Sequence, residues 1–261
     1  MSNIRAYAEI DLNAIKNNTK QVRNIIGNDV KIMAVVKADG YGHGAIMTAK
    51  AINETVDAFA VATIEEAIEI RESGIEKDIL ILGYLSPDNY GLALKHSISL
   101  TVFSYETAKV ISDFAINNGG KIKIHIAVDT GMGRIGFYPC DENVETVQKI
   151  SKLCGVEIDG VFSHFATADE EDKDYSVSQV KKFNEFLKKL ESAGVELKNR
   201  HICNSAGIID LPDCHFDMVR MGIILYGYYP SKEVKKERFK LSPSMSIKST
   251  VIHVKTIYDL K

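Results

Sequence analysis

Val35-Val36-Lys37-Ala38-Asp39-Gly40-Tyr41-Gly42-His43-Gly44 is the stretch from which the rest of this chain is best understood. The apolar run that leads into it, residues 32–36, predicts a buried strand that ends at a single lysine. The glycines that follow permit positive φ and a close approach of the backbone to a ligand. The pattern predicts a glycine-rich loop that presents the Lys37 amine at the mouth of a pocket.

A lysine at the end of a strand is either an ordinary surface residue or a reactive amine. A free lysine is protonated at neutral pH and is a poor base or nucleophile. As a Schiff base with an aldehyde cofactor it loses that charge, and it becomes a base when it is released. The segment around Lys37 by itself favours the surface residue, and the residues further along the chain reverse that preference.

Length, charge and cysteine content exclude several classes of protein. The 261 residues allow one large domain, or one domain and a fragment. The net charge of −3 and the scattered basic residues predict no nucleic-acid partner. The four cysteines form no CxxC pair, which favours reduced thiols in a cytoplasmic protein. No apolar signal core or membrane-length apolar run is visible, so we expect no membrane association.

Short apolar runs alternate with helical patterns along most of the chain. Eight runs are predicted strands: residues 31–36, 58–62, 78–82, 100–103, 121–129, 155–163, 200–203 and 217–221. Helical periodicity or helix caps mark residues 11–26, 44–53, 63–73, 104–120, 144–153 and 177–192. This alternation predicts an α/β fold, a parallel (β/α)8 TIM-like barrel over residues 1–230. A doubly wound open sheet remains the alternative, because a sequence does not show closure.

The strand at residues 121–129 has a period of two that indicates which way its side chains face. Its isoleucines alternate with a mixed set of side chains. The outer face of a barrel packs against helices and takes the apolar set. The mixed set is therefore predicted to face the barrel axis: Lys123, His125, Ala127 and Asp129.

The residues after the eighth strand do not fit a barrel. Residues 231–238 form a charged linker, and residues 245–258 alternate as in a strand. A strand needs a partner, and the sequence supplies no obvious one. We therefore expect residues 231–261 to be a linker and the start of a truncated, β-rich C-terminal domain.

Reactive side chains follow the predicted strands at the ends where barrel enzymes have their active sites. They lie at or just after the ends of the first, fifth, sixth, seventh and eighth strands: Lys37, Arg134, His164, Ser205 and Arg220. Each has a structural alternative, such as a loop salt bridge, a core histidine or a helix cap. Five independent structural roles at the same rim of the barrel are a poorer explanation than one functional site that these residues share.

The residue types at this rim suit a phosphorylated aldehyde cofactor. Phosphate sites in such barrels often follow strands seven and eight. Ser205 lies there, with the backbone N–H groups of Gly222 and Ile223, and helix-start amides favour anions. Arg134 and Arg220 add forked cations that can bind oxygen or ring-nitrogen acceptors.

Five motifs resemble those of the bacterial alanine racemase family, whose N-terminal barrel belongs to fold type III of the pyridoxal-phosphate enzymes. The resemblance extends from about residue 5 to residue 261. The motifs are Ala34-Val35-Val36-Lys37-Ala38-Asp39-Gly40-Tyr41-Gly42-His43-Gly44, Asp129-Thr130-Gly131-Met132-Gly133-Arg134, Ser163-His164-Phe165-Ala166-Thr167-Ala168-Asp169, Asn204-Ser205-Ala206 and Met218-Val219-Arg220-Met221-Gly222-Ile223. The resemblance implies an isomerase that interconverts L- and D-alanine by two-base proton transfer, in D-alanine supply to cell-wall peptidoglycan.

The same resemblance implies how the cofactor is attached. Lys37 would form the Schiff base with pyridoxal 5′-phosphate and act as one of the two bases. The phosphate would be held by Tyr41, Ser205, Gly222 and Ile223.

It also implies contacts to the ring and the substrate. Arg220 would pair with the pyridine nitrogen and keep it unprotonated. His164 would lie against the ring and help to orient Arg220. Arg134 would contact the phenolic oxygen of the cofactor and the substrate carboxylate. No residue is assigned to a metal ion.

Two positions depart from the family pattern. Many members carry a lysine, often carbamylated, where this chain has Ala127, so we expect a bound anion or a neighbouring carboxylate to orient Arg134. The second base of the family is a tyrosine that reaches in from the second domain of a partner subunit, and Tyr258 precedes its place. We therefore expect a homodimer for the complete protein, and weak or no activity for this chain alone.

Three other functions stay open on the sequence. One is a non-catalytic barrel that binds pyridoxal phosphate for cofactor homeostasis, and another is a serine racemase of the same family. The third, a metal-dependent hydrolase, would need clustered ligands such as a His-x-His on a strand, whereas the seven histidines are scattered singly.

Overall fold

Eight parallel strands follow one another around a single sheet. In the computed structural model, which describes residues 5–238 and 240–258, the strand order is β8-β7-β6-β5-β4-β3-β2-β9. The strands are β2 (Lys31–Val35), β3 (Ala58–Val61), β4 (Asp78–Ile81), β5 (Ile98–Val102), β6 (Ile122–Ala127), β7 (Val156–Phe162), β8 (Arg200–His201) and β9 (Met218–Met221). β9 pairs with β2, so the last of these strands lies beside the first.

The two strands at the ends of this order, β8 and β9, are also neighbours. The backbone N–H of Asp217 donates to the carbonyl of Arg200 (3.1 Å), and that of Arg220 donates to the carbonyl of Cys203 (2.9 Å). The sheet is therefore a nearly closed barrel, and the predicted barrel fold is confirmed. The doubly wound alternative is wrong, because such a sheet reverses its strand order at a switch point.

The observed strands begin and end within two residues of the predicted ones. The largest difference at a strand start is in β5, which begins at Ile98 rather than at residue 100. Ser99 and Thr101 are polar and yet buried on this strand, and the Thr101 hydroxyl donates to the carbonyl of Ile81 (2.7 Å). Buried polar side chains of this kind weaken the apolar signal from which a strand is predicted.

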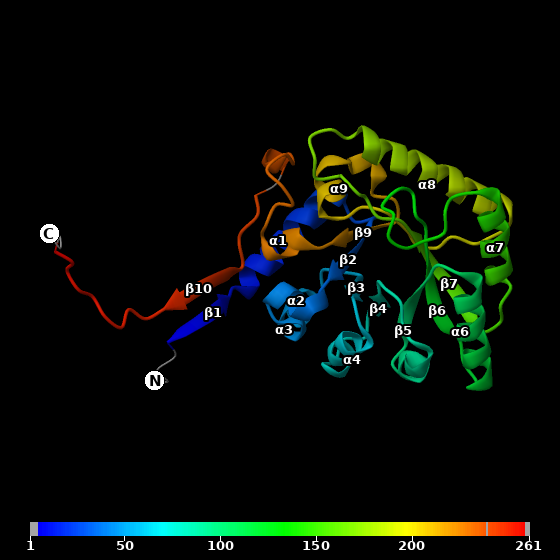
Figure 1. Ribbon diagram of the computed structural model, residues 1–261, viewed down its shortest axis with the longest axis horizontal. Helices are drawn as coiled ribbons and strands as arrows, with labels where there is room; N and C mark the ends of the chain where they lie inside the picture. Colours follow the sequence, from blue (N-terminus) through cyan, green and yellow to red (C-terminus); the bar gives the residue numbers. More distant parts are fainter. Residues whose placement is uncertain (1–4, 239, 259–261) are drawn as a thin grey trace.

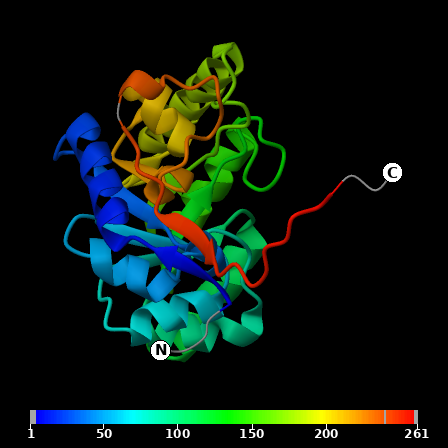
Figure 2. The same cartoon turned by 90° about the vertical axis from the view of Figure 1, so that its left-hand side faces the viewer.

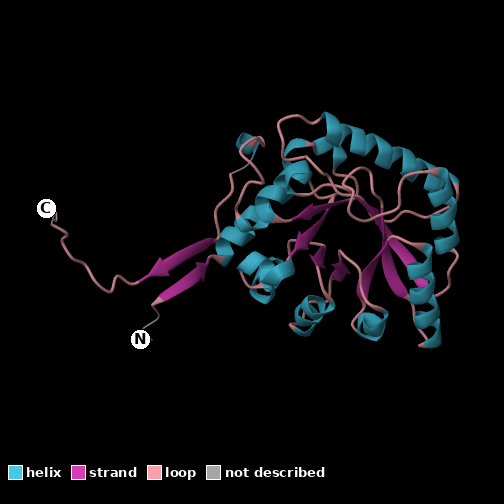
Figure 3. Cartoon of the chain, in the orientation of Figure 1, coloured by secondary structure: helices cyan, strands magenta, loops and turns pink. Residues whose placement is uncertain are grey.

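Helices surround the strands on the outside of the barrel (Figures 1 and 3). Apart from α2, described below with the site, the α-helices are α1 (Leu12–Ile26), α3 (Ala45–Ile52), α4 (Ile64–Glu72), α5 (Tyr90–Lys95), α6 (Tyr105–Asn117), α7 (Asp141–Ser151), α8 (Asp174–Ser192) and α9 (Ser205–Asp210). The 3-10 turns are η1 (Pro87–Asn89), η2 (Pro212–Cys214), η3 (Ile223–Tyr226) and η4 (Lys236–Arg238). None of these described helices is both long and apolar enough to cross a membrane.

The hydrophobic core has two parts because strand side chains alternate between two faces. The larger part lies between the strands and the helices and includes Ile122, Ile124 and Ile126 of β6. A smaller cluster comes from the opposite face of four neighbouring strands: Met33, Val35, Ala58, Ala60, Leu80 and Met218. The predicted orientation of β6 is confirmed, since the His125 ring contacts the His201 ring on the inner side.

The first residues of three predicted helical segments act as helix caps. The side chain of Asp11 accepts hydrogen bonds from two backbone N–H groups of α1, and Ser104 and Thr63 each accept one from the first turns of α6 and α4. Helices α7 and α8 begin three residues earlier than predicted, at Asp141 and Asp174. Acidic residues stabilise a helix N-terminus although they interrupt the apolar period.

A second, two-stranded sheet projects from the barrel beside α1 (Figures 1 and 2). It pairs β1 (Ala6–Ile10) antiparallel with β10 (Met245–Ser249). The expectation that the C-terminal strand has no partner was therefore wrong, because the N-terminal segment, distant in sequence, pairs with it. The strand is also shorter than predicted, since residues 250–258 form no helix or strand. The predicted C-terminal segment further includes residues 239 and 259–261, which lie outside the described residues.

Candidate functional site

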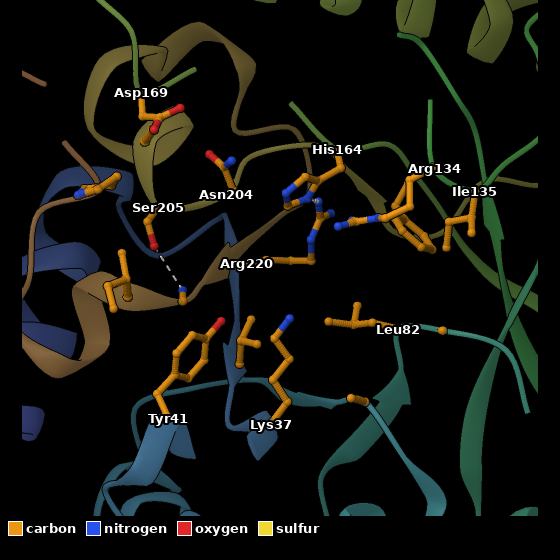
Figure 4. Close-up of a pocket in the computed structure, with 18 residues that line it drawn as sticks. Lys37, Tyr41, Leu82, Arg134, Ile135, His164, Asp169, Asn204, Ser205 and Arg220 are labelled. Carbon is orange, nitrogen blue, oxygen red and sulfur yellow. Dashed lines mark hydrogen bonds between the residues drawn. The ribbon is translucent and has the colours of Figure 1, made fainter. Parts of the chain in front are cut away.

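One cavity of about 490 Å³ opens at the C-terminal ends of the strands (Figure 4). Every residue that the sequence placed in the site lines it: Lys37, Tyr41, Arg134, His164, Ser205, Arg220, Gly222 and Ile223. Three of these side chains are cationic types, while the lining carboxylate in the described part of the chain is that of Asp169. The balance of charge in the cavity favours an anionic ligand.

Lys37 begins an unusual left-handed turn, α2 (Lys37–Gly42), where the sequence predicted a glycine loop. The four residues after it have φ of 51–61° and ψ of 36–52°, and only Gly40 among them is a glycine. A left-handed helical conformation costs roughly 1–2 kcal/mol for each residue that carries a Cβ. Backbone strain of this kind persists only where the surrounding structure holds it, and it often accompanies function.

Several hydrogen bonds hold this turn. The backbone N–H of Gly40 donates to the carbonyl of Val36 (2.9 Å), and the Asp39 carboxylate accepts from the backbone N–H of Ala45 (2.8 Å). A Cβ on Gly40 would lie 3.3 Å from the nitrogen of Ala45, so the absence of a side chain lets the turn pack on α3. The Tyr226 hydroxyl fixes the preceding strand by donating to the carbonyl of Val35 (3.0 Å).

The Lys37 amine itself is left available. Its Nζ lies 6.0 Å from the centre of the Tyr41 ring. No hydrogen bond or ion pair holds it within the described residues. Figure 4 shows its side chain directed into the cavity, below Arg220.

Tyr41, Ser205 and Gly222 form a small polar cradle at one side of the cavity. The hydroxyl of Ser205 accepts hydrogen bonds from the backbone N–H groups of Gly222 (3.2 Å) and Ile224 (3.5 Å). A Cβ on Gly222 would lie 3.4 Å from the Ser205 oxygen and 3.6 Å from the Tyr41 oxygen, so glycine keeps the space between them open. The structure does not use Ser205 as a helix cap, because Asn204 caps α9.

Arg220 lies buried on β9 and is held by backbone and side-chain acceptors. Nη1 donates to Nδ1 (2.8 Å) and to the carbonyl (3.2 Å) of His201, and Nη2 donates to His164 Nδ1 (3.1 Å) and to two further carbonyls. Among the described residues the hydrogen bonds of this guanidinium use only Nη1 and Nη2, which leaves Nε for the cavity. Burial lowers the Arg220 pKa to about 10, so the group remains a cation at neutral pH.

His164 is the neutral member of the site. Burial, helped by the charges of Arg220, Arg134 and Lys37, lowers the His164 pKa to about 3. Its Nδ1 accepts a hydrogen bond from Arg220, which requires that nitrogen to be unprotonated. An uncharged imidazole can therefore lie among three cations.

A chain of hydrogen bonds leads from Arg220 through the middle of the barrel to His201, His125 and Asp159. Of these three residues, the sequence predicted only His125 to face inward. Because Arg220 can only donate, His201 Nδ1 is an acceptor and the proton of that ring lies on Nε2. That proton is donated to His125 Nδ1 (2.9 Å), so the proton of His125 lies on Nε2, which faces the Asp159 carboxylate (3.5 Å). The hydrogen bond from His125 holds the Asp159 pKa below its usual value.

A β-bulge makes room for this chain. The register between β6 and β7 shifts between Ile124 and His125, so that His125 pairs with Gly160 and Asp159 is the extra residue. A Cβ on Gly160 would lie 2.4 Å from His125 Nδ1, so close that the ring or the strand would have to shift. Bulges commonly redirect side chains next to active sites.

The loop after β6 presents Arg134 to the cavity. Asp129 shapes this loop by accepting from the backbone N–H groups of Gly131 (2.9 Å) and Gly133 (3.0 Å). In the part of the chain that the structure describes, no carboxylate pairs with Arg134. Among the described residues, therefore, no neighbouring carboxylate orients Arg134, and the other expectation, a bound anion, stays a prediction.

Gln179 of α8 is a further residue that the sequence did not indicate. It is fully buried, donates to the Thr130 hydroxyl (3.2 Å) and the His164 carbonyl (3.0 Å), and accepts from the backbone N–H of Ala166 (3.0 Å). It thus ties the loop after β6 to the loop after β7. A polar residue on the inward face of an otherwise amphipathic helix is the signal that could have revealed it.

The described residues contain no group of three or more histidine, cysteine, aspartate or glutamate side chains that could hold a metal ion.

Comparison with known proteins gives consistent results. A family model described as the N-terminal domain of alanine racemase matches residues 10–230. Alanine racemase of Clostridium tetani is 48% identical over 252 residues, which cover 96% of this chain and 65% of that protein. Alanine racemase of Methanococcus maripaludis is also 48% identical, over 96% of this chain and 68% of that protein. The chain thus spans about two thirds of the length of these relatives.

Solved structures agree with the sequence matches. Alanine racemase of Clostridium difficile 630 in complex with cycloserine has a TM-score of 0.96 and 42% identity, covering 98% of this chain and 71% of that one. Alanine racemase of Bacillus anthracis with bound L-Ala-P has a TM-score of 0.89 and 37% identity, covering 97% of this chain and 66% of that one. With the family model matching most of its length, this chain belongs to the alanine racemase family, and it contains that family's N-terminal domain.

Proposed function

We propose that this chain binds pyridoxal 5′-phosphate and forms the barrel part of an enzyme that interconverts L- and D-alanine. The supporting observation is that an amine, two guanidinium groups, a neutral imidazole and an anion cradle share one cavity of about 490 Å³. A cavity of this size suits a cofactor together with a small amino acid. The cofactor fits the donor set because its phosphate is anionic, its ring nitrogen accepts hydrogen bonds and its aldehyde reacts with amines.

The phosphate would bind in the cradle that Tyr41, Ser205, Gly222 and Ile223 form. The N–H of Gly222 now donates to the Ser205 hydroxyl at 3.2 Å, the long end of the usual range. An anionic oxygen is a stronger acceptor than a hydroxyl and would compete for this N–H. The missing Cβ at Gly222 provides the room.

Arg220 would donate from Nε to the ring nitrogen. Five hydrogen bonds from its other two nitrogens prevent the guanidinium from turning away. With a pKa of about 10 it stays protonated at neutral pH, so the ring nitrogen would act as the acceptor and remain unprotonated. His164, held neutral, would lie against the ring without adding a further positive charge.

Lys37 would hold the cofactor covalently through its amine and, once released, move the α-proton on one face of the substrate. When bound, the cofactor delocalises the negative charge that develops at the α-carbon. Arg134 forms no ion pair with a carboxylate of the described residues, and it would bind the substrate carboxylate. A second base would act from the opposite face, and we assign it to a part of the protein outside this chain. Since a positioned acid–base group contributes about 10²–10⁴-fold, this chain alone should be weakly active or inactive.

We further propose that residues 1–230 contain the barrel domain, with β1 leaving it to pair with β10, that residues 231–261 begin a second, β-rich domain, and that the complete protein is a homodimer. The relatives are longer than this chain by about half. Apolar side chains on and after β10 are highly exposed, and such surfaces usually pack against another domain or subunit: Ile247 (81%), Val251 (76%), Ile252 (70%), Val254 (82%) and Ile257 (79%).

The test of cofactor attachment is direct. Pyridoxal 5′-phosphate added to the purified chain should give the absorbance of the lysine-bound cofactor, and borohydride should fix its mass on the peptide that contains Lys37. Lys37→Ala should abolish both signals, while Lys31→Ala, at the opposite end of the same strand, should not. Absorbance and mass retained in Lys37→Ala would refute the assignment.

Turnover separates the remaining alternatives. The chain extended by a second domain should racemise alanine much faster than the chain alone. An extended protein that binds the cofactor but racemises no amino acid would instead be a cofactor-homeostasis barrel, and one that prefers serine would be a serine racemase of this family.

A further inference from the structure

The carboxylate of Glu66 joins the ends of two barrel strands beside the reactive lysine. Oε1 accepts a hydrogen bond from the backbone N–H of Ala38 (2.7 Å), just after β2. Oε2 accepts one from the backbone N–H of Ala62 (2.7 Å), just after β3. Both bonds are short and charge-assisted, which makes them stronger than ordinary backbone bonds.

The two hydrogen bonds of the Glu66 carboxylate do not serve to cap its own helix, α4. Thr63 caps α4, and the residue three places later is expected to complete a capping box by accepting from the N–H of Thr63. Only half of that box exists: the N–H of Glu66 donates to the Thr63 hydroxyl (3.4 Å), while the carboxylate turns to Ala38 and Ala62.

The N–H of Ala38 belongs to the peptide group that links it to Lys37. Ala38 is also the first residue of the left-handed turn, with φ of 51°. Glu66 therefore fixes the plane of the peptide at which the chain leaves the strand, and so the direction of the Lys37 side chain. The Asp39 carboxylate fixes the other end of the same turn on Ala45.

We propose that Glu66 is a positioning residue that holds Lys37 in the geometry needed for covalent attachment of the cofactor. The inference rests on the proposed function only through the identity of that ligand. Without the carboxylate, the Ala38 N–H loses its acceptor and the strained turn loses one of its two carboxylate anchors. The fraction of molecules with Lys37 correctly placed then falls, and apparent affinity falls in proportion.

A matched pair of variants tests this. Glu66→Gln and Glu65→Gln each remove one negative charge from the first turn of α4, but only Glu66 contacts the strand ends. Glutamine at 66 keeps one acceptor oxygen and turns an N–H donor toward the second backbone N–H. We expect Glu66→Gln to bind pyridoxal 5′-phosphate about tenfold more weakly, or ~1.4 kcal/mol, and Glu66→Ala more weakly still. Glu65→Gln should stay within about twofold of the unmodified chain.

Amide hydrogen exchange without cofactor provides an independent measurement. The amides of Ala38 and Ala62 should exchange faster in both Glu66 variants, while amides of the distant strand β6 keep their protection. If cofactor affinity and these two amides are unchanged in Glu66→Ala, the proposal is overturned. If the unmodified chain never links the cofactor to Lys37, the proposed function fails, and the exchange data still decide whether Glu66 holds the turn.

Discussion

Replacing Gly160 by alanine tests whether the His201–His125–Asp159 chain is locked in place. The new Cβ would lie 2.4 Å from His125 Nδ1, 2.6 Å from its Cε1 and 2.9 Å from the Asn199 carbonyl oxygen. The imidazole cannot simply move away, because its nitrogens face His201 on one side and Asp159 on the other. Either the ring or the strand β7 must shift.

Two contributions set the size of the effect. Overpacking of a filled core costs about 1–3 kcal/mol. Loss of a buried hydrogen bond that leaves its donor unpaired costs a further ~1–3 kcal/mol. We therefore expect Gly160→Ala to reduce the free energy of unfolding by about 2–6 kcal/mol, a large share of the roughly 5–15 kcal/mol of a typical protein.

Urea unfolding at neutral pH measures this loss, with Gly91→Ala as the control. A Cβ on Gly91 would lie 3.7 Å from the nearest atom, a side-chain carbon of Phe114, which is ordinary contact. That control should leave stability unchanged or raise it slightly, because alanine favours the helix α5. In a His125→Ala background, Gly160→Ala should cost much less, since the clash with the imidazole is gone and only the 2.9 Å approach to the Asn199 carbonyl oxygen remains. An equal cost in both backgrounds would refute the argument.

Two further measurements address the cavity. Gly222→Ala places a Cβ between the oxygens of Ser205 and Tyr41 and should weaken pyridoxal 5′-phosphate binding at least about tenfold. Inorganic phosphate should compete with the cofactor for the unmodified chain much more strongly than for this variant. For His164, the folded-state pKa of about 3 lies below the unfolded value of about 6.5, so the unfolded chain binds the extra proton first and stability falls as pH drops from about 6.5 toward 3. At pH 5 the resulting loss in the free energy of unfolding is about 2 kcal/mol. His164→Gln should therefore lose less stability between pH 7 and pH 5 in urea unfolding than the unmodified chain. Equal losses in the two proteins would contradict this prediction.

The barrel and the rim of reactive residues follow from local patterns. Strand and helix periods are properties of a few consecutive residues, and eight alternating units leave few other ways to bury their apolar faces. Once the strands are parallel, their C-terminal ends meet at one edge, which is why residues as distant as Lys37 and Arg220 were predicted to share a cavity. Cap residues such as Asp11 act within a single turn and were equally predictable.

What the sequence by itself determined is therefore the order of the eight barrel strands and of most helices between them, the direction of the β6 side chains and the group of residues at the rim. Only the tertiary structure decided that β1 pairs with β10, that Glu66 reaches Ala38, and that His125 links Arg220 through His201 to Asp159. The physical reason is that each of these contacts joins residues distant in the chain. Their geometry depends on bulges, strained turns and ring orientations that no local period encodes.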